Sequence, residues 1–151
     1  MCPTLSVSGD YLAIAKWHRR GRGIKSGDVI SFTHPLVPGI GAVKRVVGLP
    51  GDFVVTDWEQ DPQIQGLYEP SETLIVDGDE APSHQQKQKR MIQIPDGHCW
   101  VLGDNLAESR DSRTYGPLPL ALVKGKVLGR VLPWKDRKWM SNAFEGVEGL
   151  D

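Results

Sequence analysis

The sequence predicts one mostly-β domain, and three observations predict it. Its 17 glycines and 11 prolines fall between short apolar runs, which is typical of strands and turns rather than of long helices. Several of these runs alternate apolar and polar residues, as a half-buried strand does. The turn dipeptides Asp77-Gly78 and Asp96-Gly97 follow or precede such runs. We therefore expect short strands that are joined by turns and loops.

The expected elements can be placed along the chain. In order, the strands cover 11–16, 28–33, 41–48, 52–57, 73–78, 91–95, 98–103 and 124–132. The polar segments 59–72 and 81–90 are expected to be loops, and the apolar run 118–125 is expected to form one short helix. The stretch 134–151 has little periodicity, so we expect residues 1–133 to form the domain and 134–151 to be a peripheral tail.

Composition and charge exclude several classes of protein. A net charge of −1 gives no whole-chain reason to expect nucleic acid or an anionic membrane as a partner. The chain as given carries neither a signal peptide nor the roughly 20 consecutive apolar residues of a membrane span. Cys2 and Cys99 fit no metal-binding spacing, and no two of the four histidines have ligand spacing. We expect no metal site, and the pairing of the two cysteines stays open.

The run VKRVVGLPGD, residues 43–52, places a lysine among apolar, β-branched neighbours. Because side chains alternate along a strand, Lys44 and Arg45 are expected on opposite faces, one toward solvent and the other toward bonding partners. Desolvation lowers the pKa of a lysine, and a neutral lysine can act as a general base that activates a hydroxyl. The alternative is an edge strand from which Lys44 reaches water.

The segment 101–120, VLGDNLAESRDSRTYGPLPL, is dense in Gly, Asp, Asn and Ser and is expected to be a structured turn. In an extended segment Asp111 and Arg113 share a face and can pair, and Arg45 is a further candidate partner for Asp111. Ser109 and Ser112 offer hydroxyls that can hold a lysine amine. Taken alone, the segment is better explained as a turn that is held by hydrogen bonds from side chains to the backbone.

The two stretches together, KRVVGLPGD and then GDNLAESRDSRTYG, resemble the signal peptidase I family of membrane-bound serine–lysine proteases. The mitochondrial inner membrane peptidases of the catalytic subunit 1 type resemble them most. Three further pieces agree in order, namely MCPTLSVSGDY, GRGIKSGDVI and IPDGHCWVLGDN. The resemblance covers roughly residues 1–133. It implies a mostly antiparallel, coiled, barrel-like fold of the type that signal peptidases and self-cleaving repressors share.

The resemblance implies a role for each matching residue. Lys44 would be the general base, and Arg45 matches the arginine beside it. Ser109 would orient the lysine, while Asp111 and Arg113 would form a supporting ion pair. The residues just before the lysine would line the substrate groove, where a strand edge can bind an extended peptide by strand addition. These residues are Gly41, Ala42 and Val43.

The nucleophile is the point at which the sequence departs from the pattern. In the family the serine directly precedes the methionine of Ser-Met-x-Pro-Thr, and in this sequence that methionine is Met1. The serine, the residues that help build the oxyanion hole and the membrane anchor would all lie outside this chain. We therefore expect the chain as given to be inactive as a peptidase. A truncated gene model and a genuine inactive form are both left open.

The resemblance implies an endopeptidase that removes sorting or signal peptides from proteins sent to the mitochondrial intermembrane space. It implies a place at the inner membrane, a second peptidase subunit as partner in a heterodimer, and no cofactor or nucleic acid. A bacterial-type signal peptidase is the nearest alternative. A non-catalytic β domain that binds peptides or a partner subunit is the alternative of a different class. A self-cleaving repressor ranks last, because no helix-turn-helix pattern precedes the core.

Overall fold

The computed structural model of the chain describes residues 10–56, 74–75, 90–132, 134, 137–142 and 144. The strands found in these residues are β1 (Tyr11–Ala15), β2 (Val29–Thr33), β3 (Gly41–Gly48), β4 (Phe53–Thr56), β5 (Leu74–Ile75), β6 (Arg90–Gln93), β7 (His98–Leu102), β8 (Leu118–Pro119), β9 (Val123–Leu132) and β10 (Lys138–Trp139). The short helical segments are η1 (Lys16–Gly21), α1 (Ser112–Tyr115) and η2 (Leu120–Leu122), where η denotes a 3-10 helix. The predicted mostly-β class is confirmed.

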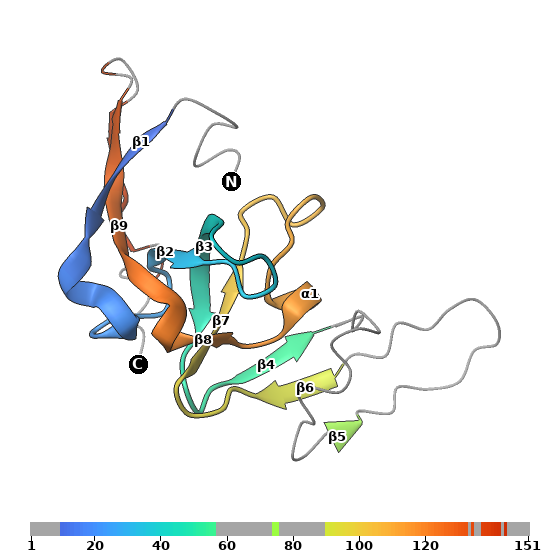
Figure 1. Cartoon of the computed structure of the whole chain (residues 1–151). Coiled ribbons are helices and arrows are strands. Elements are labelled where there is room, and N and C mark those ends of the chain that lie inside the picture. The colour runs from blue at the N-terminus through green and yellow to red at the C-terminus, as the bar shows by residue number, and fades with distance from the viewer. Residues whose placement is uncertain are drawn as a thin grey trace.

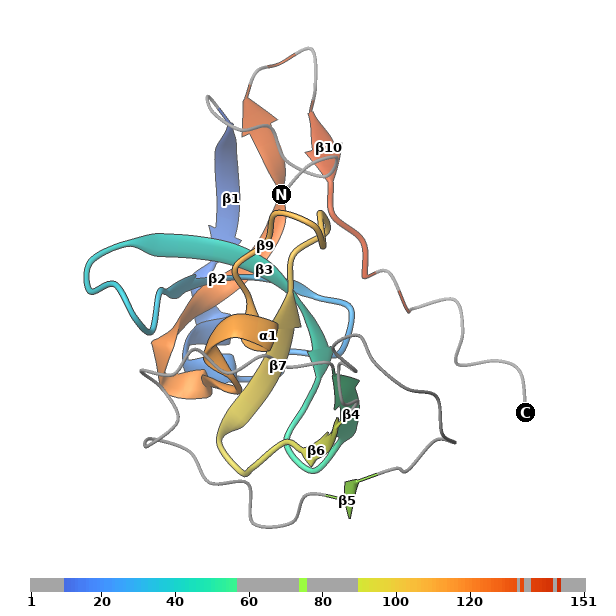
Figure 2. The same cartoon turned by 90° about the vertical axis from the view of Figure 1, so that its right-hand side faces the viewer.

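The strands form a large sheet and a small one, and every pairing in both is antiparallel. The large sheet runs in the order β1-β9-β2-β3-β7-β8, and β10 pairs with β9; the small sheet runs β4-β6-β5. Figure 1 shows β1 and β9 running together on one side and the small sheet on the other. Irregular register interrupts the β1–β9, β2–β9 and β3–β7 ladders, and such bulges increase strand twist. In Figure 2 β3 curves through the middle of the molecule.

Alternation of apolar residues places the core. Along β9 the residues at every second position from Val123 to Val127 are buried, as expected for a strand with one face on the core. The central strand β2 is buried at four of its five positions, because strands flank it on both sides. A second cluster, Ile92, Ile94 and Trp100, packs where β6 passes β7. The main core cluster consists of Ile24, Ile30, Phe32, Val46, Cys99, Val101, Tyr115, Leu118 and Val123.

The expected strands are confirmed wherever the structure describes them, with ends that shift by one or two residues. The helix expected over 118–125 is wrong. Leu118 is fully buried in β8, where it pairs with Cys99 of β7. Residues 120–122 form only the short η2, and β9 already begins at Val123. Pro119 has no N–H to donate, and a short apolar run fits a buried strand as well as it fits a helix.

Of the two expected turns, only one lies in the described part of the chain. The Asp96-Gly97 turn is present, with Gly97 at φ 73° and a hydrogen bond from His98 N to Pro95 O of 3.2 Å. The turn at Asp77-Gly78, the 59–72 loop and residues 81–89 lie outside the described residues. Among the described helices, none is both long enough and apolar enough to cross a membrane.

Candidate active site

Lys44 lies in β3 on the face that turns toward the core. It shares this face with Ala42, which packs on the main cluster, and with the fully buried Val46. Burial lowers the pKa of Lys44 from the ordinary 10.5; the charge of Arg113 lowers it further, while Asp111 and Asp104 oppose the shift. The apolar setting therefore favours the neutral amine that a general base needs.

The amine of Lys44 has one well-defined partner. Its Nζ donates a hydrogen bond of 2.6 Å to Ser109 Oγ, which lies in the loop between β7 and α1. The Ser109 hydroxyl in turn hydrogen-bonds the carboxylate of Asp111 and helps to lower the pKa of that carboxyl. In this contact Lys44 Nζ is the donor and Ser109 Oγ the acceptor. The lone pair of a neutral Lys44 therefore remains available for another proton.

Asp111 is fully buried, and its carboxylate accepts hydrogen bonds from Gly103 and Arg113. Its carboxylate accepts from Gly103 N at 3.0 Å, and from Arg113 through the backbone N at 3.2 Å and the guanidinium Nε at 3.0 Å. Burial alone would raise the pKa of Asp111, but the bonds from Arg113, Gly103 and Ser109 outweigh it, and the pKa is lowered. A buried, ionised carboxylate thus anchors this loop.

The pairing of Asp111 with Arg113 has a different cause from the expected one. The expectation was an extended segment in which both side chains share a face. The structure instead makes Asp111 the N-cap of α1, so that its carboxylate bonds Arg113 N, and the Arg113 side chain folds back onto the same carboxylate. Arg113 Nη2 also donates to Leu106 O at 2.7 Å, which ties the loop to the cap.

Gly103 is the point at which the loop passes closest to the lysine. A Cβ placed there would collide with Ser109 Oγ and would lie 3.1 Å from Lys44 Nζ. A side chain at this position would therefore displace the hydrogen bond between Lys44 and Ser109. The Gly-Asp-Asn turn supplies both the room for the lysine and, through Gly103 N, a donor for Asp111.

Arg45 does not pair with Asp111, and the expectation of that contact is wrong. Because it alternates with Lys44, Arg45 points to the opposite face of β3. There it makes a two-point ion pair with Asp104, with Nε–Oδ1 at 3.1 Å and Nη2–Oδ2 at 3.2 Å. Its Nη1 donates to Gly27 O at 2.9 Å. Both faces of the strand thus carry bonding partners, whereas the sequence led us to expect one of them to face solvent.

The residues just before Lys44 lie on a strand edge that has no partner strand in the described part of the chain. From Gly41 to Lys44, β3 pairs with β2 on one side, and its pairing with β7 on the other side begins only at Arg45, opposite Leu102. No described strand pairs with that second edge over 41–44. The backbone groups of Gly41, Ala42 and Val43 are therefore positioned for an added strand that would end beside the lysine.

Three residues near the site, Asp104, His34 and Tyr115, were not predicted from the sequence to belong to it. Asp104 was expected only as a turn residue, because one of the side chains of Lys44 and Arg45 was expected to face solvent and therefore to need no partner. The ring of His34 packs edge-on against Tyr115, with 5.4 Å between centroids. Burial lowers the pKa of His34, and the charges of Lys44 and Arg110 lower it further. No sequence pattern connects His34 with Tyr115.

Other expected contributors lie elsewhere or outside the described residues. Ser112 does not hold the lysine; it is buried and its Oγ accepts from Val101 N at 2.9 Å. Residues 1–9, and with them Cys2, are outside the part of the chain that the structure describes. Cys99 is a buried free thiol, and burial raises its pKa to about 12, so it is a poor nucleophile. Among described residues no group of His, Cys, Asp or Glu is suited to a metal ion.

The geometry is that of a half-buried, oriented amine beside an open strand edge, which suits proton abstraction from a hydroxyl bound next to an extended peptide. Comparison with known proteins agrees. The family model described as "Signal peptidase, peptidase S26" matches residues 1–132.

Individual relatives are also similar to this chain. The mitochondrial inner membrane protease subunit 1 of Saccharomyces cerevisiae is 36% identical over 98% of this chain and 77% of its own length. The mitochondrial inner membrane protease subunit 2 of Danio rerio is 28% identical over 92% of this chain and 62% of its own. A signal peptidase I structure from Enterococcus faecalis is 27% identical, with a TM-score of 0.45 over 70% of this chain and 97% of its own.

Proposed function

Because this chain belongs to the peptidase S26 family of signal peptidases, we propose that it is the catalytic region of a serine endopeptidase in which Lys44 is the general base. The observation that carries the proposal is the 2.6 Å hydrogen bond from Lys44 Nζ to Ser109 Oγ, on a lysine whose pKa burial has lowered. A lysine kept merely for solubility would be expected to extend into water rather than to be held half-buried against Ser109.

The proposed reaction proceeds in two halves. Lys44 takes the proton of a serine hydroxyl as the serine oxygen attacks the scissile carbonyl carbon of the bound peptide. The protonated lysine then gives its proton to the departing amine, and an ester to the serine remains. Lys44 next takes a proton from water as the water oxygen attacks the ester, and it gives that proton to the serine oxygen when the new carboxyl end is released. Ser109 keeps the amine aimed throughout.

The proposed substrates are proteins with cleavable sorting or signal peptides, presented as an extended strand. Support comes from the unpaired edge of β3 over 41–44, which offers backbone groups to such a peptide right up to the lysine. We place the cleaved proteins among those sent to the mitochondrial intermembrane space, because the relatives are named mitochondrial inner membrane proteases.

The proposed location is the inner membrane, facing the intermembrane space, with an anchor that precedes this region. Exposed aromatic side chains support a membrane neighbour. Trp134 is 72% exposed, Trp139 71% and Tyr11 66%, and Arg137 stacks on Trp134 at 4.6 Å. Aromatic rings with nearby cations suit the membrane–water interface. Because the relatives are named as subunits 1 and 2, we also propose a heterodimer with a second subunit of this family.

The test requires a serine at the proposed nucleophile position. We define the extended form as this chain joined at Met1 to a signal peptidase N-terminal segment whose last residue is serine. The extended form is expected to cleave a peptide that spans the sorting site of an intermembrane-space protein. The same form with alanine in place of that serine, or with Lys44→Met, is expected to leave the peptide intact.

The outcome also decides between catalysis and binding. The unpaired edge of β3 favours peptide binding with or without turnover. If the extended form binds the peptide, measured by fluorescence anisotropy, but never cleaves it, the chain is a peptide-binding domain and the proposed enzyme is wrong. Cleavage that persists at full rate in the alanine form would equally exclude a serine mechanism.

A further inference from the structure

We propose that residues 138–142, together with Phe144, belong to the support of the catalytic lysine, with Asn142 as a positioning residue that acts through the 26–28 turn and Arg45. This inference rests on the proposed function. The segment lies beyond the residues that match the family model, which end at residue 132. It contacts the domain through strand pairing with β9 and through hydrogen bonds of the Asn142 side chain.

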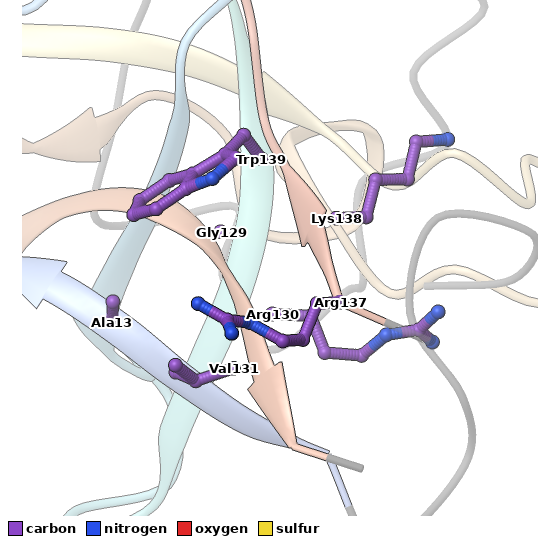
Figure 3. A pocket seen from close by; sticks show the side chains of 7 residues that line it. All are labelled: Ala13, Gly129, Arg130, Val131, Arg137, Lys138 and Trp139. Carbon is purple, nitrogen blue, oxygen red and sulfur yellow. The ribbon is translucent and has the colours of Figure 1, made fainter. Parts of the chain in front are cut away.

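The segment reaches the domain as an added strand. Lys138 pairs with Arg130 and Trp139 with Gly129, and Met140 N donates to Leu128 O at 2.8 Å. Figure 3 shows Trp139 lying across Gly129 while Lys138 points away on the other side. Strand pairing fixes the direction of the chain and delivers the residues after Met140 to the 26–28 turn.

Both the nitrogen and the oxygen of the Asn142 side-chain amide form hydrogen bonds. Its Nδ2 donates to Ser26 O at 2.8 Å and to Asp28 Oδ1 at 3.1 Å, and its Oδ1 accepts from Phe144 N at 2.8 Å. The side chain sits directly over Gly27, where a Cβ would collide with Asn142 Oδ1 and would lie 2.7 Å from the Phe144 ring. Gly27 has φ 92°, so the turn conformation itself also favours glycine.

The 26–28 turn is bonded to β3 through the backbone of Val46 and through the side chain of Arg45. Gly27 N donates to Val46 O at 2.7 Å, and Val46 N donates to Asp28 O at 2.8 Å. Gly27 O accepts from Arg45 Nη1 at 2.9 Å. The carboxylate of Asp28 is fully buried and pairs with Lys126 of β9 at 2.8 Å, which fixes the turn to that strand.

Arg45 connects the 26–28 turn to the loop between β7 and α1, which carries Ser109. Its two bonds to Asp104 hold the residue next to Gly103, and Gly103 is the residue that packs against both Ser109 Oγ and Lys44 Nζ. A shift of the 26–28 turn would move Arg45, then Asp104, and so loosen the packing that keeps Lys44 desolvated. The side-chain contacts from Asn142 to Ser26, from Arg45 to Gly27 and from Arg45 to Asp104 are hydrogen bonds of 3.2 Å or less, and the last step, from Gly103 to Lys44, is a packing contact.

The position of these contacts predicts which kinetic constant changes. In the β2–β3 pairing, Val29 lies opposite Arg45, whereas Thr33 lies opposite Gly41 at the groove end. The contacts of Asn142 therefore support the end of β3 that carries Lys44 and do not reach the edge proposed to bind substrate. Loss of Asn142 is expected to lower kcat and to leave KM unchanged, since the remaining interaction with bound substrate is the same.

The primary experiment does not depend on catalysis. The pKa of Lys44 is measured by NMR titration of its side-chain resonances in the chain of residues 1–151, as wild type, Asn142→Leu, Asn142→Ala and the control Ser141→Ala. Leucine keeps the approximate volume of asparagine and removes its hydrogen bonds. Ser141 is the exposed neighbour. We expect a higher pKa for Lys44 in both Asn142 variants, because water gains access to the amine, and the wild-type value in Ser141→Ala.

The kinetic experiment follows in the extended form. We expect kcat to fall about tenfold in Asn142→Leu, part of the contribution that a positioned general base makes, at unchanged KM. An unchanged Lys44 pKa in both Asn142 variants would overturn the inference whether or not the extended form cleaves. A raised Lys44 pKa together with an extended wild type that never cleaves would instead refute the proposed function and leave the coupling standing.

Discussion

Lys44 Nζ and Ser109 Oγ lie 2.6 Å apart although 65 positions separate them in the sequence. The contact joins the middle of β3 to the loop between β7 and α1. It is possible because Asp111, buried behind Ser109, holds that loop through Gly103 N and Arg113. The contact holds the half-buried amine of Lys44 in one orientation.

Removing the Ser109 hydroxyl is expected to impair turnover more than stability. In Ser109→Ala the amine of Lys44 loses its partner, and a misplaced base costs roughly 10²-fold in rate. We expect kcat of the extended form to fall by about that factor while KM and the melting temperature change little. Steady-state kinetics with a thermal melt of the same sample measure both. A kcat equal to that of wild type would show that Ser109 does not orient the base.

The pH dependence of cleavage should follow the charge near Lys44. Only the neutral amine accepts a proton, so kcat/KM should rise as pH rises through the pKa of Lys44, and burial places that pKa below 10.5. The positive charge of Arg113 lowers this pKa. In Arg113→Met the pKa should therefore increase, and the rise in kcat/KM should move to higher pH. A rise that stays at the same pH would mean that another group is titrating.

Acid should weaken the fold partly through Asp111. Its folded-state pKa is lower than the ordinary 3.8, so its contribution to the free energy of unfolding is full above that value and is lost as pH falls through the folded pKa. We expect Asp111→Asn to reduce the difference in free energy of unfolding between pH 7 and pH 3, as measured by urea denaturation. The exposed Asp96 provides the control, because Asp96→Asn should keep the wild-type difference. An unaltered difference in Asp111→Asn would contradict the buried network.

Arg45→Lys tests the geometry of the second face of β3. A lysine keeps the charge but not the two-point contact with Asp104 or the bond to Gly27 O. We expect kcat of the extended form to fall about tenfold, equivalent to about 1.4 kcal/mol in the barrier. Asp104→Asn and the double variant complete a cycle, and the two losses should not add, because both act on one contact. Additive losses would argue against the pair.

Much of the fold could be predicted from the sequence, because alternation and turn residues are local signals. Strands such as β2 and β3 lie close to the expected positions. The segment 118–125 could not be assigned in this way, since its short apolar run fits either a helix or a buried strand. Tertiary pairing of Leu118 with Cys99 decides the matter.

The site was predictable only in part. The pattern singled out Lys44, Ser109, Asp111 and Arg113, and the structure brings them together. The partner of Arg45 was misassigned, because two aspartates of one loop were available and only the fold shows that Asp104 reaches the second face of β3. The contact of Asn142 with the 26–28 turn spans more than a hundred residues and leaves no local pattern.

The most direct test of the account restores the amine chemically. In the extended form, Lys44→Cys should abolish cleavage, and alkylation of that thiol with 2-bromoethylamine should bring cleavage back by rebuilding an amine at nearly the same position. Lys44→Met retains Cys2 and Cys99, so the same treatment should restore nothing there. Cleavage by Lys44→Met at the wild-type rate would contradict the claim that Lys44 is the general base.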